Sequence, residues 1–347
     1  MGRLGGMEKK KLYCCSSYYQ LLISLMKIMT EDGTADLLLE VHGIETAGSL
    51  AGRIREQLPD RVEKVFVCED SSRIDPYSQR LCSFLPLQRK RLLDHMEKVF
   101  DGVDPSAEYG ERNVFWDLGY AGTCFNIRKL PYRLLEDSLD SCKRIRENRP
   151  NYRYIFHRRS PKFLLKKYLG AGVIPFGFSP YCIEIEVNDP KGIQIPSEKV
   201  TALSRKELTA SLSDRQKEQL LGIFAGEEEP FRAFDGSEVL LLTEPFALTH
   251  RLPDEETQIR MYRDLVSEYA AGKRLVIKAH PRDPADYRKY FPSAEILEKN
   301  MPMEVLAFCG NFCPARVMTV TSSAVFNVPG DGEKISLGAG LLKNYQR

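Results

Sequence analysis

A histidine that follows an apolar run is the first candidate for chemistry in this sequence. Residues 275–277 read Leu-Val-Ile, and Lys278, His280 and Pro281 come directly after them. An imidazole changes charge near neutral pH, so His280 could bind an anion or donate a proton. A loop histidine that bonds to the backbone is the alternative interpretation.

Two adjacent serines follow a second apolar run. Ser322 and Ser323 come after Val-Met-Thr-Val at 317–320 and an intervening threonine. Backbone amides at a helix start, together with two hydroxyls, can form a phosphate cradle. Ordinary N-capping is the alternative, although one hydroxyl is enough for it. Between the two motifs, Glu304 opens a short predicted helix, where its oxygens could accept hydrogen bonds from a ribose diol or could interact with the helix dipole.

The elements that must position these residues alternate between strands and helices. Such alternation is typical of an α/β protein in which helices cover both faces of a parallel sheet. The candidate residues then lie at the carboxyl ends of strands, where ligands bind in open parallel sheets. The expected strands are 11–15, 37–41, 64–68, 114–118, 132–135, 237–243, 274–278 and 316–320, and the main expected helices are 18–29, 47–57, 88–100, 204–224, 255–271 and 303–308.

The chain length and a Gly/Pro-rich stretch predict two domains. The 347 residues exceed one ordinary core, and residues 168–196 are rich in glycine and proline, which is typical of a domain junction. We therefore expect one Rossmann-like domain over 1–185 and another over 190–347, facing a central cleft.

Composition excludes several classes of protein. Hydrophobic residues make up 43% of the chain and charged residues 28%, as in soluble globular proteins. A net charge of +2 argues against nucleic-acid binding. No apolar run reaches the roughly 18 to 20 residues that span a bilayer. No signal-peptide cleavage site is recognisable and the nine cysteines are irregularly spaced, so we expect a cytoplasmic protein with free thiols.

The order of the three late motifs resembles the nucleotide half of bacterial sialyltransferases, in particular glycosyltransferase family 52 and the related capsular polysialyltransferases. The resemblance implies a glycosyltransferase B type fold, with the acceptor side in 1–185 and the nucleotide-sugar side in 190–347. It implies that His280 and the serines bind the phosphate of CMP-sialic acid and that Glu304 binds the ribose. The nucleotide-binding residues expected on this basis are Lys278, His280, Pro281, Glu304, Ser322 and Ser323.

The first half of the chain offers counterparts of the family's acceptor-side motifs. Glu136 and Asp137 stand where the family has an acidic pair, but Ser138 replaces the glycine that follows it. We expect Asp137 to be the general base and Glu136 to contact substrate. The acidic residues 254–256 are an alternative source of a base, although their position favours the start of a helix.

The opening segment resembles the family's donor-sugar segment. Ser16, Ser17 and Gln20 are therefore expected to bind the sugar, with a plain helix start capped by Ser17 as the alternative.

The resemblance implies a metal-independent single displacement with inversion and no cofactor, in which His280 stabilises or protonates the leaving CMP. The acceptor would be a cell-surface glycan of lipooligosaccharide or capsule type. A hexosyltransferase that uses a UDP-sugar is one alternative. A catalytically degenerate nucleotide-sugar-binding protein is another, to which Ser138 points.

A basic stretch raises the question of a membrane partner. Residues 156–168 interleave Lys and Arg with Leu and Phe, as expected of a helix on an anionic inner membrane surface. A solvated helix face is the alternative interpretation. A homodimer is kept as a further hypothesis.

Overall fold

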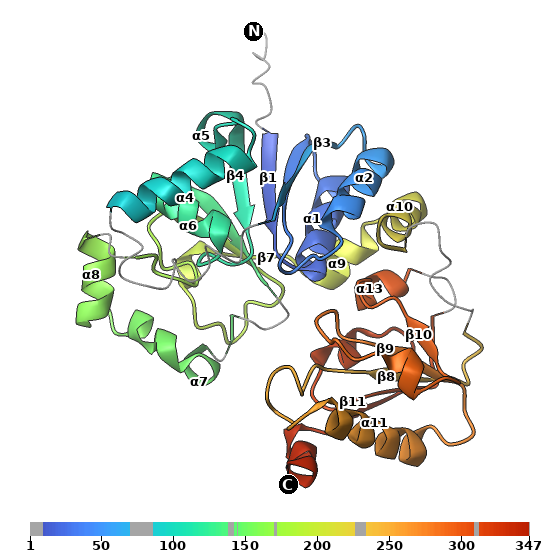
Figure 1. The fold of residues 1–347 in the computed structure, drawn as a ribbon. Helices are drawn as coiled ribbons and strands as arrows, with labels where there is room; N and C mark the ends of the chain where they lie inside the picture. The colour runs from blue at the N-terminus through green and yellow to red at the C-terminus, as the bar shows by residue number, and fades with distance from the viewer. Residues whose placement is uncertain are drawn as a thin grey trace. The chain divides into compact units, whose positions relative to one another are not determined.

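The computed structural model describes residues 10–69, 86–137, 142–143, 145–169, 172–225, 234–308 and 312–346. The chain separates into two compact units, Met1–Gln216 and Lys217–Arg347 (Figure 1). Each unit is built around its own parallel sheet.

The first unit contains a seven-stranded parallel sheet in the order β3-β2-β1-β4-β5-β6-β7. The chain adds β2 and β3 on one side of β1. It then returns to place β4 on the other side of β1 and adds β5, β6 and β7 beyond it. The switch point between β1 and β4 is where ligands bind in such sheets. The strands are β1 (Lys10–Cys15), β2 (Ala35–Glu40), β3 (Val62–Cys68), β4 (Tyr109–Val114), β5 (Tyr132–Leu135), β6 (Cys182–Val187) and β7 (Val200–Ala202).

Helices connect these strands. Ser17 caps the first of them, and that helix packs on β1 and against α9, so nearly all of its side chains are buried. The helices of this unit are α1 (Tyr18–Thr30), α2 (Ala47–Gln57), α4 (Pro86–Val99), α5 (Pro105–Glu108), α6 (Tyr120–Arg128), α7 (Ile145–Asn148), η2 (Pro150–Phe156), α8 (Pro161–Leu169), η3 (Ser197–Lys199) and α9 (Arg205–Ala210), and α10 (Asp214–Ala225) crosses the boundary between the units.

The burial of α1 encloses a lysine, and carboxylates compensate its charge. The Lys27 ammonium lies 2.6 Å from the Glu186 carboxylate and 2.7 Å from that of Glu31. Arg205 lies 2.9 Å from the other oxygen of Glu186. A buried charge is tolerated only when it is paired, so this cluster ties α1 and α9 to β6.

The second unit repeats the pattern with five parallel strands in the order β10-β9-β8-β11-β12. Its switch point lies between β8 and β11. Its elements are β8 (Val239–Leu242), α11 (Glu255–Tyr269), β9 (Leu275–Lys278), α12 (Tyr287–Tyr290), β10 (Glu295–Leu297), α13 (Met303–Leu306), β11 (Arg316–Thr319), η4 (Ser323–Asn327), β12 (Glu333–Ser336) and η5 (Ala339–Tyr345).

The structure confirms the α/β class but moves three boundaries. The expected strand 114–118 is instead β4, which ends at Val114. The expected junction 168–196 contains β6, an inner strand of the first sheet. The expected helix 204–224 is divided into α9 and α10.

The boundary between the units consequently lies later than 185–190. Strand β7 pairs with β6, and α9 packs on α1, so the chain stays with the first unit as far as Gln216.

The described residues contain no helix with both the length and the apolar character needed to cross a bilayer.

Gly43 tests how tightly the ends of β1 and β2 fit together. A Cβ atom on Gly43 would lie 1.8 Å from the Ser16 carbonyl oxygen, whereas one on Gly52 in α2 would meet nothing within 4 Å. We expect Gly43→Ala to lower the free energy of unfolding by about 1–3 kcal/mol, because backbone must move. Gly52→Ala should raise it by about 0.5–1 kcal/mol. Denaturant titration measures both, and equal stability of the two variants would contradict this close approach.

Candidate active site

The strand exits at the switch point of the second unit are joined by one carboxylate. Glu244, just after β8, accepts hydrogen bonds from the Thr321 amide at 2.7 Å, from the Thr321 hydroxyl and from the Thr319 hydroxyl at 3.3 Å. Thr319 and Thr321 lie at the end of β11. The carboxylate thus fixes the turn that leads into the two serines, and no sequence motif marked Glu244 for this role.

The serine turn is ordered by local bonds. The Ser322 amide donates to the Thr319 hydroxyl at 3.2 Å, and the Ser322 hydroxyl accepts from the Ala324 amide at 3.3 Å. Ser322 is therefore the N-cap of η4. Ser323 begins η4, and its side chain is outside the part of the chain that the structure describes.

His280 lies at the neighbouring exit, after β9, and is held in one orientation. Its backbone amide donates a hydrogen bond to the Thr243 hydroxyl at 3.3 Å, and its Nδ1 accepts one from the Arg282 amide at 3.1 Å. Burial, with the nearby charges of Arg282 and Lys278, lowers the pKa of His280 to about 4. The imidazole is then neutral at pH 7, and because Nδ1 accepts, Nε2 carries the proton. His280 can therefore donate a hydrogen bond from Nε2 without being an imidazolium.

Buried polar side chains anchor the loop that carries His280 and Pro281. Asp283 accepts from the Gln258 amide group at 3.0 Å and from the Tyr287 hydroxyl at 2.8 Å. The Gln258 side-chain oxygen in turn accepts from the Ala247 amide at 2.8 Å. Gln258 thus connects the loops after β8 and β9. Sequence reasoning missed this connection, because its partners are far apart in the chain.

Lys278 points its ammonium into the protein. It donates to the carbonyls of Lys299 at 2.8 Å and Ala279 at 3.2 Å, and only 5% of the residue is exposed. Burial lowers its pKa to about 7, while Glu298 and Glu304 oppose that shift. In this structure the Lys278 ammonium thus joins the exits of β9 and β10. Its contact with the nucleotide stays a prediction.

Glu304 lies close to the other expected residues of this unit. It is half-buried in α13, which packs against η4, and its charge acts on Lys278. The structure brings His280, Glu304 and the serine turn to the same edge of the sheet, as the motif order predicts.

The base expected in the first unit lies at the end of β5. Asp137 accepts a hydrogen bond from the Gln20 amide group, and Gln20 is itself 3% exposed in α1. The Gln20 side-chain oxygen accepts from the Ser16 amide at 2.6 Å and the Ser16 hydroxyl at 3.1 Å. Burial raises the pKa of Asp137, whereas Gln20 and the charge of Arg149 favour its ionised form. A carboxylate with a raised pKa is a stronger base than one in water.

Other expected sugar-binding residues have local partners. The Ser17 hydroxyl accepts from the Gln20 amide at 3.2 Å and caps α1, which is the alternative that the sequence left open. Glu136 is 4% exposed and accepts from the Asn188 amide at 2.7 Å, so it fixes the loop after β6. Ser138 lies outside the described residues.

The alternative acidic cluster begins a helix. Asp254 is the N-cap of α11 and accepts from the Thr257 amide at 2.8 Å, and Glu255 accepts from the Tyr290 hydroxyl at 2.7 Å. The structure confirms that this cluster belongs to a helix start.

An aromatic cluster borders the exit of β4, next to that of β5. The rings of Trp116, Tyr152 and Phe176 contact one another edge to face, with centroids 5.2–6.3 Å apart. The neighbouring Asp117 is fully buried and accepts from the amides of Phe176 and Gly177. Burial raises the pKa of Asp117 to about 6. No sequence motif marked this cluster.

Solved structures similar to this chain share its fold at low identity. UDP-GlcNAc 2-epimerase from Neisseria meningitidis, bound to UDP-GlcNAc, is 8% identical with a TM-score of 0.51 and covers 96% of this chain and 89% of its own. The S. aureus MnaA-UDP co-structure is 11% identical with a TM-score of 0.50 and covers 92% and 77%. The glycosyltransferase B domain of a Photobacterium damselae sialyltransferase is 12% identical with a TM-score of 0.47 and covers 94% and 90%.

We expect the His280 imidazole to titrate near pH 4 and to carry its proton on Nε2 at pH 7. The unfolded chain takes up this proton below its ordinary pKa of 6.5, so His280 should make folding less stable as the pH falls from 6.5 toward 4. Long-range ¹H–¹⁵N NMR spectra, assigned with His280→Gln, measure both midpoint and tautomer. A midpoint at or above 6.5 would contradict the burial that we describe.

Sequence relatives identify the family. An uncharacterized Haemophilus influenzae protein is 30% identical over 131 residues, which are 38% of this chain and 42% of that protein, so the match spans less than half of the relative. The sequence model of glycosyltransferase family 52 matches residues 147–336, more than half of the chain. This range includes the His280, Glu304 and serine motifs. The two Rossmann-like units are of the glycosyltransferase B type and share their fold with the UDP-GlcNAc 2-epimerase. The chain belongs to glycosyltransferase family 52.

Proposed function

We propose that this chain is a glycosyltransferase that transfers sialic acid from CMP-sialic acid to a cell-surface glycan of lipooligosaccharide or capsule type. The observation that carries the proposal is the meeting of a neutral His280, the serine turn and Glu304 at the carboxyl edge of the second sheet. Their order along the chain is that of the phosphate- and ribose-binding motifs in the sialyltransferases that the sequence resembles.

The nucleotide end of the site suits a leaving group with a single phosphate. The Nε2–H of His280 and the polar groups of the serine turn donate hydrogen bonds to the phosphate oxygens, and Glu304 accepts from the ribose hydroxyls. With a pKa of about 7, Lys278 carries part of a positive charge nearby at neutral pH. These groups stabilise the negative charge that develops on CMP as it departs, and no metal takes part in the proposed step.

Asp137 acts at the acceptor end. As the acceptor oxygen attacks the anomeric carbon, the bond from that carbon to the phosphate oxygen breaks and its electron pair leaves with CMP. The acceptor proton passes to Asp137, whose carboxylate Gln20 holds in position. One such displacement inverts the configuration at the anomeric carbon.

The proposal places the enzyme in the cytoplasm, in peripheral contact with the inner face of the membrane where a lipid-linked acceptor is found. A homodimer stays a prediction from the sequence. A hexosyltransferase with a UDP donor is the alternative, and the bound nucleotide distinguishes the two.

CMP should raise the melting temperature of the protein by several degrees at about 100 times its dissociation constant, because a ligand that binds only the folded state stabilises it by about 2.7 kcal/mol there. UDP at equal concentration should give a much smaller shift. His280→Ala should lose most of the CMP shift, and Lys273→Ala, on the exposed turn after α11, should keep it. A larger shift with UDP would favour the hexosyltransferase.

Asp137→Asn should lower kcat by about 10²–10⁴-fold, because the amide cannot accept the acceptor proton. The CMP-induced melting shift should stay unchanged, since Asp137 does not take part in nucleotide binding. Asp189→Asn, which changes a partly exposed carboxylate after β6, is the matched control and should keep kcat near that of the natural chain. If Asp137→Asn retains more than about a tenth of kcat, another group is the base.

A further inference from the structure

Helix α8 exposes apolar side chains and buries a lysine. Leu164 and Leu165 are 39% and 40% exposed and Tyr168 is 70% exposed, whereas Lys166 is 8% exposed. The Lys166 ammonium donates to the Val173 carbonyl at 2.8 Å. A surface helix normally turns its polar side to water, so this exposed apolar face requires a partner.

A basic pocket of about 130 Å³ lies at the end of this helix. Arg89 of α4, Lys129 after α6, and Lys166 and Lys167 of α8 line it, and no Asp or Glu is among its described lining residues. Burial, and after it the charge of Lys162, lowers the pKa of Lys166 to about 8. An anion in the pocket would lie among the four cationic side chains that line it.

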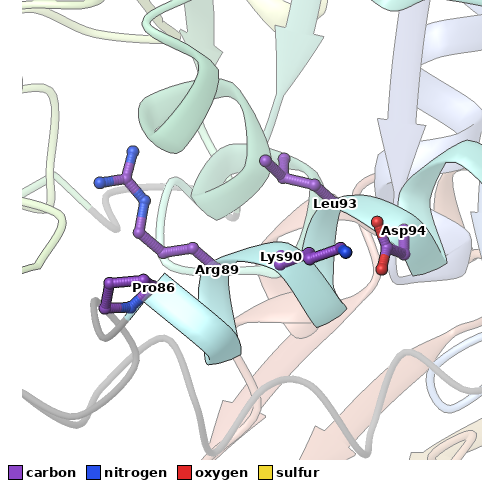
Figure 2. Close-up of a pocket in the computed structure, with 5 residues that line it drawn as sticks. All are labelled: Pro86, Arg89, Lys90, Leu93 and Asp94. Carbon is purple, nitrogen blue, oxygen red and sulfur yellow. The ribbon is translucent and has the colours of Figure 1, made fainter.

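The start of α4 extends the same surface, and Figure 1 shows it beside α8. Arg89 also borders a shallower hollow of about 360 Å³ with Pro86, Lys90, Leu93 and Asp94. Figure 2 shows Arg89 extending away from Lys90 and Asp94, which lie further along α4. Leu87, one turn before Lys90 and Arg91, is 63% exposed. Exposed leucine next to Lys and Arg thus recurs on both helices.

We infer that α8 and the basic pocket form a docking site for an anionic phospholipid surface. A headgroup phosphate enters the pocket, and the side chains of Leu164, Leu165 and Tyr168 enter the boundary between headgroups and acyl chains. Leucine and tyrosine beside lysines are what an interfacial helix presents to a membrane. Aromatic rings keep the flanking cations in place, since Lys162 lies 4.4 Å from the Tyr154 ring centroid and Lys167 lies 5.1 Å from that of Tyr168.

A free phosphate would satisfy the pocket alone and leave the leucines in water. A lipid surface would both place a phosphate in the pocket and cover the leucines. The basic pocket and the exposed apolar side chains together therefore favour a lipid surface. The site gives the peripheral membrane contact of the proposed function a location. The docking site rests on the membrane contact in the proposed function, and it does not depend on the identity of the donor.

Flotation with lipid vesicles, without nucleotide, tests this site in the full chain. The protein should bind vesicles of phosphatidylglycerol and phosphatidylcholine, bind pure phosphatidylcholine much less, and lose affinity as salt is raised. The pair Lys129→Gln/Lys167→Gln should weaken binding by about 25-fold, at about fivefold for each cation near an anionic surface. Leu164→Ser/Leu165→Ser should weaken it by about tenfold or more.

The pair Lys64→Gln/Lys206→Gln removes the same charge from exposed positions of the same unit and should change binding by less than about twofold. Equal weakening by this control pair, or no binding to the anionic vesicles, would overturn the proposal. A third result would also overturn the proposal: glycerol phosphate raises the melting temperature, Lys129→Gln/Lys167→Gln abolishes that shift, and no vesicle binds. The pocket would then bind a soluble phosphate. CMP shifts measured on the same variants separate this result from a failure of the donor proposal.

Discussion

The hydrogen bonds that Thr321 donates to the Glu244 carboxylate hold together the strand exits on which the candidate nucleotide site depends. Neighbouring strands of a parallel sheet are fixed by their ladder only as far as their last paired residues, here Leu242 and Thr319. Beyond them, the Glu244 carboxylate joins the two exits at the switch point and so sets the direction of the serine turn. Gln20 has the same role in the first unit, where it connects α1 to Asp137. Each unit therefore positions its candidate groups with one polar side chain that joins strand exits: the half-buried Glu244 in the second unit and the buried Gln20 in the first.

Local patterns in the sequence predict the strands that carry the nucleotide motifs, because the mostly apolar runs at 239–242, 275–277 and 317–320 mark β8, β9 and β11. The positions of His280 and Ser322 at strand ends follow directly from them. The sequence misplaces β4, since Arg112 and Asn113 are polar but buried within it. It hides β6 among glycines and prolines, where the buried Glu186 is stabilised by Lys27, a partner 159 positions away. Pairings over such distances leave no local signal.

The same limit applies to side-chain roles. Lys278 stands in the predicted motif, yet its ammonium bonds to two backbone carbonyls, and Ser17 caps a helix. The overall fold cannot assign these roles either, because a UDP-GlcNAc 2-epimerase shares it at 8% identity. In the proposed function, activity depends on groups at the strand exits: a neutral imidazole with its proton on Nε2, a serine turn, and a carboxylate whose pKa burial raises.

The most direct test of the central claim is the product itself. Purified protein, CMP-sialic acid and a galactose-terminated oligosaccharide are incubated together, and the mass of the oligosaccharide is measured by mass spectrometry. If the protein transfers sialic acid, the mass of the oligosaccharide should rise by one sialic acid residue, and one CMP should be released for each product formed. Unchanged oligosaccharide and intact donor, under conditions in which CMP binds the protein, would contradict it.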